Sequence, residues 1–265
     1  MIRICLDAGH GEGYNPSPCG YGYKEGTRMF EYQSYLKEAL EQYEDVEVVC
    51  TREKVSDDPS LFGRAQRAQG SHLLLSLHSN AAGNGVYEGT DYVAVFASVY
   101  ADNDMLNLAN RIAGAVTRVM DPWQAWQVHQ KWNGTHTADW MGVIRHACNI
   151  GVPALLIEHS FHTDSRITRW LMEDGNLKAL AAAEAAAIAV HYGLRKEENE
   201  VRYKTIADMK ADKTAQTHYL PTIEKLLANG VLQGREGEGD SLVLDLSEDA
   251  VRLLVILDRA GVFDK

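Results

Sequence analysis

Three short apolar segments each lead into a polar residue that can bind a metal ion or carry a proton. Residues 2–6 are followed closely by His10, residues 73–77 by His78, and residues 152–157 by Glu158. Ligands of open α/β sheets bind beyond the carboxyl ends of the strands. If the three segments are neighbouring strands, they bring two histidines and a glutamate to one edge, which indicates a site for metal-assisted hydrolysis.

Strands and helices are expected to alternate along the first 190 residues. Hydrophobic periodicity predicts strands at 2–7, 46–50, 73–77, 87–96 (at or near an edge) and 154–157. It predicts helices at 27–43, 59–69, 104–120 and 164–192, the last broken at Asp174-Gly175-Asn176. This order predicts an α/β fold with a doubly wound, mostly parallel twisted sheet and helices on both faces.

A charged run near residue 195 marks a change of organisation. Its pattern is typical of a solvated linker. We therefore expect a large domain at 1–194, a linker at 195–202 and a small, mainly helical domain at 203–265. Two helices are predicted there, at 218–229 and 247–260. Glycines follow both, as expected at helix C-termini, and a serine opens the second.

Composition and charge exclude some classes of partner. The formal net charge of the 265 residues is −11, which argues against general nucleic-acid binding because phosphate contacts need surface Lys and Arg. No run approaches the roughly 18 apolar residues of a membrane span, so no membrane insertion is expected. The first residues already read as a strand with no basic leader or cleavage site, which predicts synthesis in the cytoplasm without a signal peptide.

His10 and His78 are flanked by small residues that leave room for a ligand, Gly9 and Gly11 around the first, and Ser79 and Asn80 after the second. Imidazole is a common zinc ligand at neutral pH, and a catalytic zinc site needs three protein ligands and one open position. Two histidines alone do not complete such a site. On spacing alone, a zinc site and a pair of structural strand-end histidines both remain open.

Four segments occur in an order that resembles a known family. They are Asp7-Ala8-Gly9-His10-Gly11, Glu25-Gly26-Thr27, Ser76-Leu77-His78-Ser79-Asn80-Ala81 and Pro153-Ala154-Leu155-Leu156-Ile157-Glu158. Over residues 1–193 the chain resembles the zinc-dependent N-acetylmuramoyl-L-alanine amidases called amidase type 3. These enzymes cut the amide between the lactyl group of muramic acid and the first L-alanine of the peptidoglycan stem peptide. The resemblance implies a Zn²⁺ hydrolase that acts on glycan strands with stem peptides.

The resemblance also implies roles for particular residues. His10, Glu25 and His78 match the family's zinc ligands, and Glu158 matches its catalytic glutamate. Glu31 is a rival third ligand because it lies in a Glu-Tyr-Gln context. We prefer Glu25, which precedes the predicted helix at the family's distance.

The implied mechanism is hydrolysis at the metal. Zinc polarises the carbonyl and lowers the pKa of its water, while Glu158 takes a proton from that water and passes one to the leaving nitrogen. The chain departs from the family pattern after Glu158, where His159 stands in place of a small or apolar residue. Strand alternation predicts that His159 points away from Glu158 and has a structural or supporting role.

Substrate contacts are assigned to Arg64, Trp132 and Trp140. Arg64 matches a recurring arginine of the family, and its alternative role is a structural ion pair. Four of the five tryptophans lie between 123 and 140, a density that suggests an exposed surface on which sugar rings and peptides stack. The alternative is a loop folded over the zinc cleft with its own small core.

The C-terminal part weakly resembles an S-layer homology module in three segments, residues 203–208, 223–234 and 246–253. The family's Thr-Arg-Ala-Glu signature is absent, and Ser247-Glu248-Asp249-Ala250 stands in its place. We expect a module that binds a secondary cell-wall polymer. The alternative is a unit for homodimerisation or for stability.

Together these expectations describe a phage endolysin that reaches the wall after release through holin-type pores or lysis. A bacterial autolysin is the nearest alternative. Two other functions remain open, a non-catalytic wall-binding protein and a metallopeptidase that cuts within the stem peptide.

Overall fold

The computed structural model describes residues 1–196 and 201–263. The chain divides into two compact units, Met1–Glu197 and Glu198–Lys265. Residues 197–200 of the predicted linker lie outside the described residues. Each unit has a hydrophobic core of its own.

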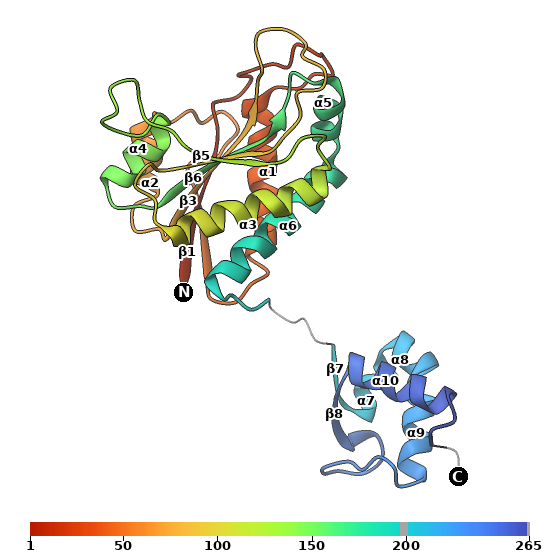
Figure 1. The fold of residues 1–265 in the computed structure, drawn as a ribbon. Helices are drawn as coiled ribbons and strands as arrows, with labels where there is room; N and C mark the ends of the chain where they lie inside the picture. Colours follow the sequence, from red (N-terminus) through yellow and green to blue (C-terminus); the bar gives the residue numbers. More distant parts are fainter. Residues whose placement is uncertain (197–200, 264–265) are drawn as a thin grey trace. The chain divides into compact units, whose positions relative to one another are not determined.

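The larger unit is built on a central sheet with helices packed beside it (Figure 1). The sheet has six strands in the order β2-β1-β3-β6-β4-β5. The strands are β1 (Ile2–Ala8), β2 (Val46–Cys50), β3 (Leu73–Asn80), β4 (Ala94–Ala97), β5 (Gln127–Gln130) and β6 (Ala154–Phe161). The first four in sheet order are parallel, whereas β4 is antiparallel to β6 and parallel to β5. The predicted mostly parallel sheet is confirmed.

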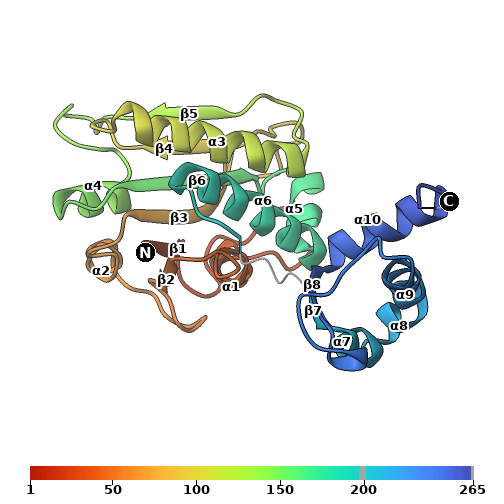
Figure 2. The same ribbon diagram turned by 90° about the horizontal axis from the view of Figure 1, so that it is seen from below.

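Helices cover both faces of this sheet (Figure 2). They are α1 (Glu25–Leu40), α2 (Leu61–Arg67), α3 (Asn103–Met120), α4 (Gly142–Asn149), α5 (Ser165–Met172) and α6 (Asp174–Tyr192). Helices α1, α3 and α6 pack over the larger core, and α2 and α4 pack over a smaller one. Strand β3 contributes to both cores, because Leu75 and Leu77 lie in the larger core and Leu74 lies in the smaller one.

Several predicted elements need correction. The strand expected at 87–96 is shorter, because only Ala94–Ala97 pairs in the sheet. Helix α1 begins at Glu25, two residues before the predicted start, so that Glu25 lies in its first turn rather than in a loop. The helical break lies at Glu173, and the Asp174-Gly175-Asn176 segment opens α6.

The smaller unit contains more elements than its two predicted helices. It has a two-stranded sheet of β7 (Arg202–Thr205) and β8 (Val243–Ser247), a 3₁₀ turn η1 (Gly239–Ser241), and helices α7 (Ile206–Ala211), α8 (Lys213–His218), α9 (Leu220–Ala228) and α10 (Glu248–Arg259). Ser247 caps α10 through Ala250 N–H, and Gly230 and Gly261 have positive φ values after α9 and α10. These features confirm the predicted helix ends.

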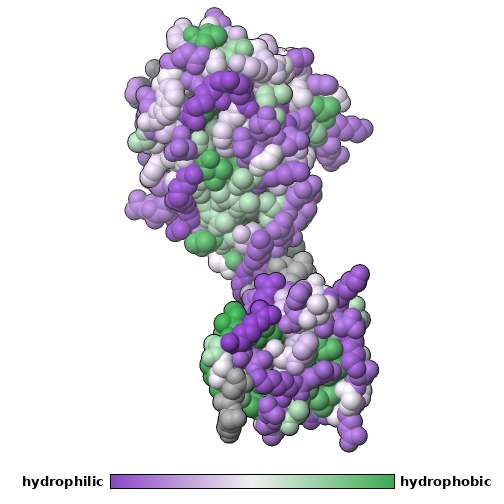
Figure 3. Space-filling view, turned by 90° about the vertical axis from the view of Figure 1, so that its right-hand side faces the viewer, coloured by the Kyte–Doolittle hydropathy of each residue, from purple (hydrophilic) through white to green (hydrophobic). Residues whose placement is uncertain are grey.

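Hydrophilic side chains cover much of the visible face of each unit, with smaller hydrophobic areas between them (Figure 3). Among the described residues, no helix combines the length and apolar character needed to span a bilayer.

Candidate active site

The carboxyl ends of β1, β3 and β6 bring the predicted site residues together. The N–H of Gly9, the residue before His10, donates to the Leu77 carbonyl. This bond extends the β1–β3 ladder by one step. His78 and Glu158 are register partners on β3 and β6. Side chains of partners in a parallel pair leave the same face of the sheet, so His78 and Glu158 lie side by side.

Glu25 lies between the two histidines from the start of α1. Its carboxylate is buried, with Oε1 2.9 Å from His78 Nδ1 and Oε2 3.3 Å from His10 Nε2. The N–H of Ser79 donates to Oε1 at 3.0 Å, and the Asn15 amide donates to Oε2 at 2.9 Å. One ligand atom from each of His10, Glu25 and His78 lies within 4.8 Å of the other two.

The two histidines favour the ionised form of the Glu25 side chain. Burial alone would raise the pKa of Glu25, but its hydrogen bonds to His10 and His78 hold that pKa far below the usual range. Burial alone would lower the pKa of His10, and Glu25 more than reverses that effect. The three side chains therefore form a set in which an anionic oxygen faces two ring nitrogens.

Glu31, the rival third ligand, lies apart from this set. Its side chain is 44% exposed and forms an ion pair with Arg28 on the same helix. It is absent from the one group of metal-ligating side chains found among the described residues. The geometry therefore favours Glu25, which is the choice made from the sequence.

The backbone around the site is too crowded for side chains at two positions. A Cβ on Gly9 would lie 2.2 Å from the His78 ring, and one on Gly26 would lie 1.8 Å from the Gly11 carbonyl oxygen. His10 itself adopts a left-handed φ of 59°, a conformation that non-glycine residues rarely adopt. The neighbouring contacts must hold this strained residue in place.

Arg64 supplies such contacts. Its buried guanidinium makes five hydrogen bonds, which use all of its N–H groups. The acceptors are the carbonyl oxygens of Pro59, Ala8 and His10 and the carboxylates of Asp7 and Asp58. No N–H remains for the substrate contact assigned to Arg64, so we interpret it through the structural alternative, as a residue that fixes the loop carrying His10.

Asp7 is the buried partner of Arg64. Burial alone would raise its pKa, but the ion pair with Arg64 at 2.7 Å, together with Ser76 at 2.6 Å and Thr51 at 2.5 Å, holds the pKa below its usual value. A carboxyl with a lowered folded-state pKa stabilises the protein above its unfolded-state pKa. That contribution is lost as the pH falls through the lower, folded-state value.

We expect Asp7→Asn to lower the free energy of unfolding at pH 7 by about 2 kcal/mol, because hydrogen bonds to a charged group are replaced by weaker neutral ones. As the pH falls below about 4, the free energy of unfolding should decrease less in the variant than in the wild type. Urea unfolding at a series of pH values measures both effects. Equal pH dependence in the two proteins would contradict the assignment.

Glu158 is half-buried on β6, and its Oε2 is buried without a hydrogen-bond partner in the described part of the chain. Burial and the nearby Glu25 carboxylate raise the pKa of Glu158 well above its usual range. His159 lies on the opposite face of the strand and is fully buried, as strand alternation predicts. The site therefore holds one carboxyl among ring nitrogens and, beside them, a second carboxyl whose Oε2 has no partner among the described residues.

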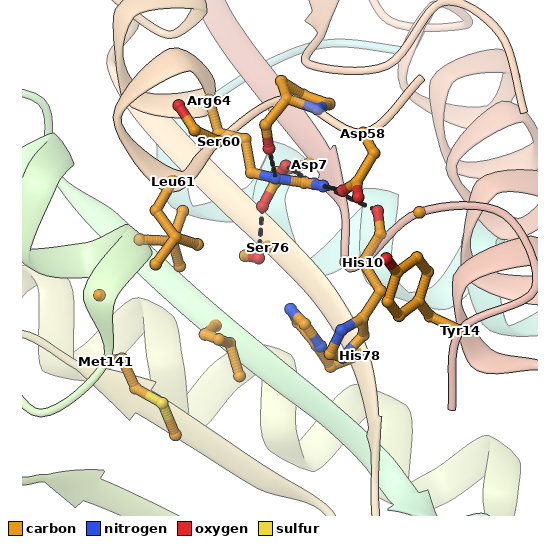
Figure 4. A pocket seen from close by; sticks show the side chains of 16 residues that line it. Asp7, His10, Tyr14, Asp58, Ser60, Leu61, Arg64, Ser76, His78 and Met141 are labelled. Atoms are coloured by element: carbon orange, nitrogen blue, oxygen red, sulfur yellow. Dashed lines mark hydrogen bonds and ion pairs between the residues drawn. The ribbon is translucent and has the colours of Figure 1, made fainter. Parts of the chain in front are cut away.

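A cavity of about 420 Å³ opens beside His10 and His78 (Figure 4). Ser76 and the Asp7–Arg64 pair also line it, and Figure 4 shows Leu61 and Met141 on the side away from the histidines. Leu61 begins α2 and Met141 precedes α4, so the cavity lies between the starts of these two helices and the sheet edge.

The four tryptophans between 123 and 140 are exposed, as one alternative from the sequence expects. Trp132 and Trp140 are 38% and 52% exposed, and neither lines this cavity. Trp132 packs against Tyr100, and Lys131 lies over the Trp140 ring at 4.3 Å. Trp140 directly precedes Met141 at the cavity wall, and Trp132 is the antiparallel bridge partner of Asp139, the residue before Trp140.

Sequence reasoning missed two supporting residues. Asn15 donates to Glu25 and lies 3.0 Å from His10 Nε2, while its carbonyl accepts from the Glu25 N–H. His162 is buried, stacks on Tyr23 and hydrogen-bonds to Ser79. The only signal for Asn15 was an Asn-Pro dipeptide in a loop, which by itself indicates a turn.

Comparisons with known proteins agree with this architecture. The family model Amidase_3, described as N-acetylmuramoyl-L-alanine amidase, matches residues 4–190. No curated protein matches the chain.

Solved structures share the fold at low sequence identity. The catalytic domain of CwlV, an N-acetylmuramoyl-L-alanine amidase from Bacillus (Paenibacillus) polymyxa var. colistinus, matches with a TM-score of 0.60 and 18% identity over 74% of this chain and 100% of that one. An N-acetylmuramoyl-L-alanine amidase from Clostridium difficile 630 gives 0.62 and 19% over 72% and 97%. The CwlD amidase from Clostridioides difficile, solved with the GerS lipoprotein, gives 0.59 and 20% over 73% and 99%. With the family model spanning most of the larger unit, the chain belongs to the Amidase_3 family of N-acetylmuramoyl-L-alanine amidases, which hydrolyse an amide bond of peptidoglycan.

Proposed function

We propose that this amidase binds zinc through His10, Glu25 and His78 and cuts the bond between N-acetylmuramic acid and L-alanine with Glu158 as proton carrier. The observation that carries the proposal is the convergence of three ligand atoms within 4.8 Å beside Glu158. His10 and His78 each offer a ring nitrogen and Glu25 offers a carboxylate oxygen, so the three side chains can act as the three protein ligands of one zinc ion.

The donor set also fits the chemistry. Zinc bound by three protein ligands supplies a Lewis acid for the scissile carbonyl and lowers the pKa of a bound water. A ligand set of two imidazoles and one carboxylate favours the binding of zinc over that of magnesium or calcium. Ser79 and Asn15 fix the orientation of Glu25 by donating to its two oxygens, and such contacts orient metal ligands.

Glu158 is suited to move the proton. Its Oε2 has no hydrogen-bond partner among the described residues, which leaves a lone pair to accept a proton from the attacking water. Once it holds that proton, Glu158 can deliver it to the leaving alanine nitrogen. One side chain thus serves both proton transfers.

We place the substrate in the cavity between α2, α4 and the sheet edge. Leu61, 47% exposed, offers an apolar wall at its rim. Trp140 lies next in sequence to the cavity wall, and we propose that it and Trp132 stack on sugar rings or on the stem peptide. Arg64 also lines this cavity, but all of its N–H groups donate to protein acceptors, so none is left to bind substrate.

The test is the identity of the products from purified peptidoglycan. We expect the enzyme to release stem peptides with a free N-terminal L-alanine and to leave the glycan strands intact, as mass spectrometry detects. A chelator should stop release, and added zinc should restore it. New amino termini within the stem peptide would identify a metallopeptidase instead, and wall binding without any release would identify a non-catalytic protein.

The smaller unit has its own hydrophobic core, formed around Tyr203, Met209, Ile223 and Val251. We propose that it binds a secondary cell-wall polymer and keeps the catalytic unit near its substrate. Homodimerisation through this unit stays the alternative. The phage endolysin setting and the release from the cytoplasm stay predictions from the sequence.

A further inference from the structure

A polar cluster is buried on the opposite face of the sheet from the catalytic side chains. It consists of His159 on β6, Glu184 on α6 and Tyr32 on α1, and the exposed fraction of each is 0%. The rest of the buried face of α6 is apolar, with alanines, leucines and Ile188. Buried polar groups destabilise a core unless they are paired, so a cluster of this kind has to be held in a defined arrangement.

The cluster lies beside an irregularity in the sheet. His78 pairs with Glu158, but the next register pair is Asn80 with Phe161. Strand β6 therefore uses one residue more than β3 at this point, and Ser160 takes a left-handed φ of 56°. Bulges of this kind redirect side chains next to active sites. The strand positions of His78 and Glu158 depend on how this bulge is held.

His159 connects the cluster to the bulge. Its Nδ1 lies 2.8 Å from the His78 carbonyl oxygen, which only accepts, so Nδ1 carries a hydrogen and donates it. Its Nε2 lies 3.2 Å from Glu184 Oε2. The Tyr32 hydroxyl donates to the same oxygen at 2.5 Å, and the Tyr32 ring meets the His159 ring edge-on at 4.9 Å.

We propose that His159 and Glu184 are positioning residues of the metal site. Glu184, itself held by Tyr32, fixes the His159 ring, and the ring holds the His78 carbonyl so that His78 faces Glu25 and Glu158. The same helix α1 carries Tyr32 and Glu25, so the cluster ties together the elements that supply the site. The inference rests on the proposed zinc site, and it adds supporting residues to it.

Two substitutions at one position separate the two contacts of His159. In His159→Asn, the side-chain amide nitrogen takes the place of Nδ1 and keeps the bond to the His78 carbonyl. In His159→Gln, the amide reaches the place of Nε2 and keeps only the contact with Glu184. We expect His159→Gln to weaken zinc affinity about 10- to 100-fold, the usual effect of losing a contact that orients a ligand. His159→Asn should stay at least about fivefold tighter than His159→Gln.

The readout is the zinc dissociation constant, measured by competition with a chelating dye at a temperature where circular dichroism shows each protein folded. Ile188→Val, one turn along α6 from Glu184, is the matched core control and should bind zinc like the wild type. Tyr32→Phe removes a single hydroxyl and should weaken binding about threefold, which keeps the test decisive if a His159 variant does not fold.

A purely structural cluster would give a different pattern. Its variants would unfold at lower temperature but bind zinc within about twofold of the wild type, and that result would overturn the inference. A wild-type protein that binds no zinc would overturn the proposed site and this inference together. Wild-type binding with weakened His159→Gln and Tyr32→Phe supports both.

Discussion

Replacing Glu158 by glutamine is expected to slow amide hydrolysis of peptidoglycan about 10²- to 10⁴-fold, the usual contribution of a general acid–base residue. Glutamine keeps the size of the side chain but cannot take a proton from water. The Oε2 of Glu158 is buried and unpartnered in the described part of the chain, so no structural hydrogen bond is lost at that atom. Zinc content and melting temperature should therefore stay near those of the wild type.

The measurement is the initial rate of stem-peptide release, followed by mass spectrometry, together with the bound zinc per chain. Glu38→Gln makes the same chemical change on the exposed side of α1 and should leave the rate unchanged. A Glu158→Gln enzyme that works at the wild-type rate would remove Glu158 from the mechanism. A variant that has lost its zinc would show that Glu158 supports the metal site instead.

Glu25→Gln is expected to weaken zinc affinity by more than about 100-fold, beyond the usual effect of losing a contact that only orients a ligand. A carboxamide lacks the negative charge that Glu25 places between two imidazoles. Activity should fall with metal occupancy and return in part at high zinc concentration. Zinc affinity by dye competition and activity against added zinc measure the two effects.

Glu31→Gln is the matched control, because it changes the other candidate carboxylate on the same helix. Glu31 forms an ion pair with Arg28, and because the Glu31 side chain is 44% exposed, solvent screens this pair and its contribution is small. We expect zinc affinity within about twofold of the wild type. If Glu31→Gln lost zinc and Glu25→Gln kept it, the assignment of the third ligand would be reversed.

The central part of the fold follows from local patterns. The runs at β1, β2 and β3 are apolar, β-branched or leucine-rich, and their predicted bounds agree closely with the sheet. The polar strand β5 and the short helix α4 were missed, because Gln127–Gln130 lacks an apolar run and α4 begins at a glycine. Both form through packing against neighbours, which periodicity does not report.

The sequence by itself placed His10, His78 and Glu158 at strand ends, because strand direction alone brings such residues to one edge. Only the tertiary structure shows that Glu25, and not Glu31, lies between the two histidines. It also shows that every N–H of Arg64 already donates a hydrogen bond, and that the His159 ring contacts the His78 carbonyl. The contacts responsible join residues far apart in the chain, with a sequence separation of 53 for Glu25 and His78 and of 57 for Asp7 and Arg64. Such contacts depend on how α1 and α2 pack on the sheet, and local residue patterns do not encode that packing.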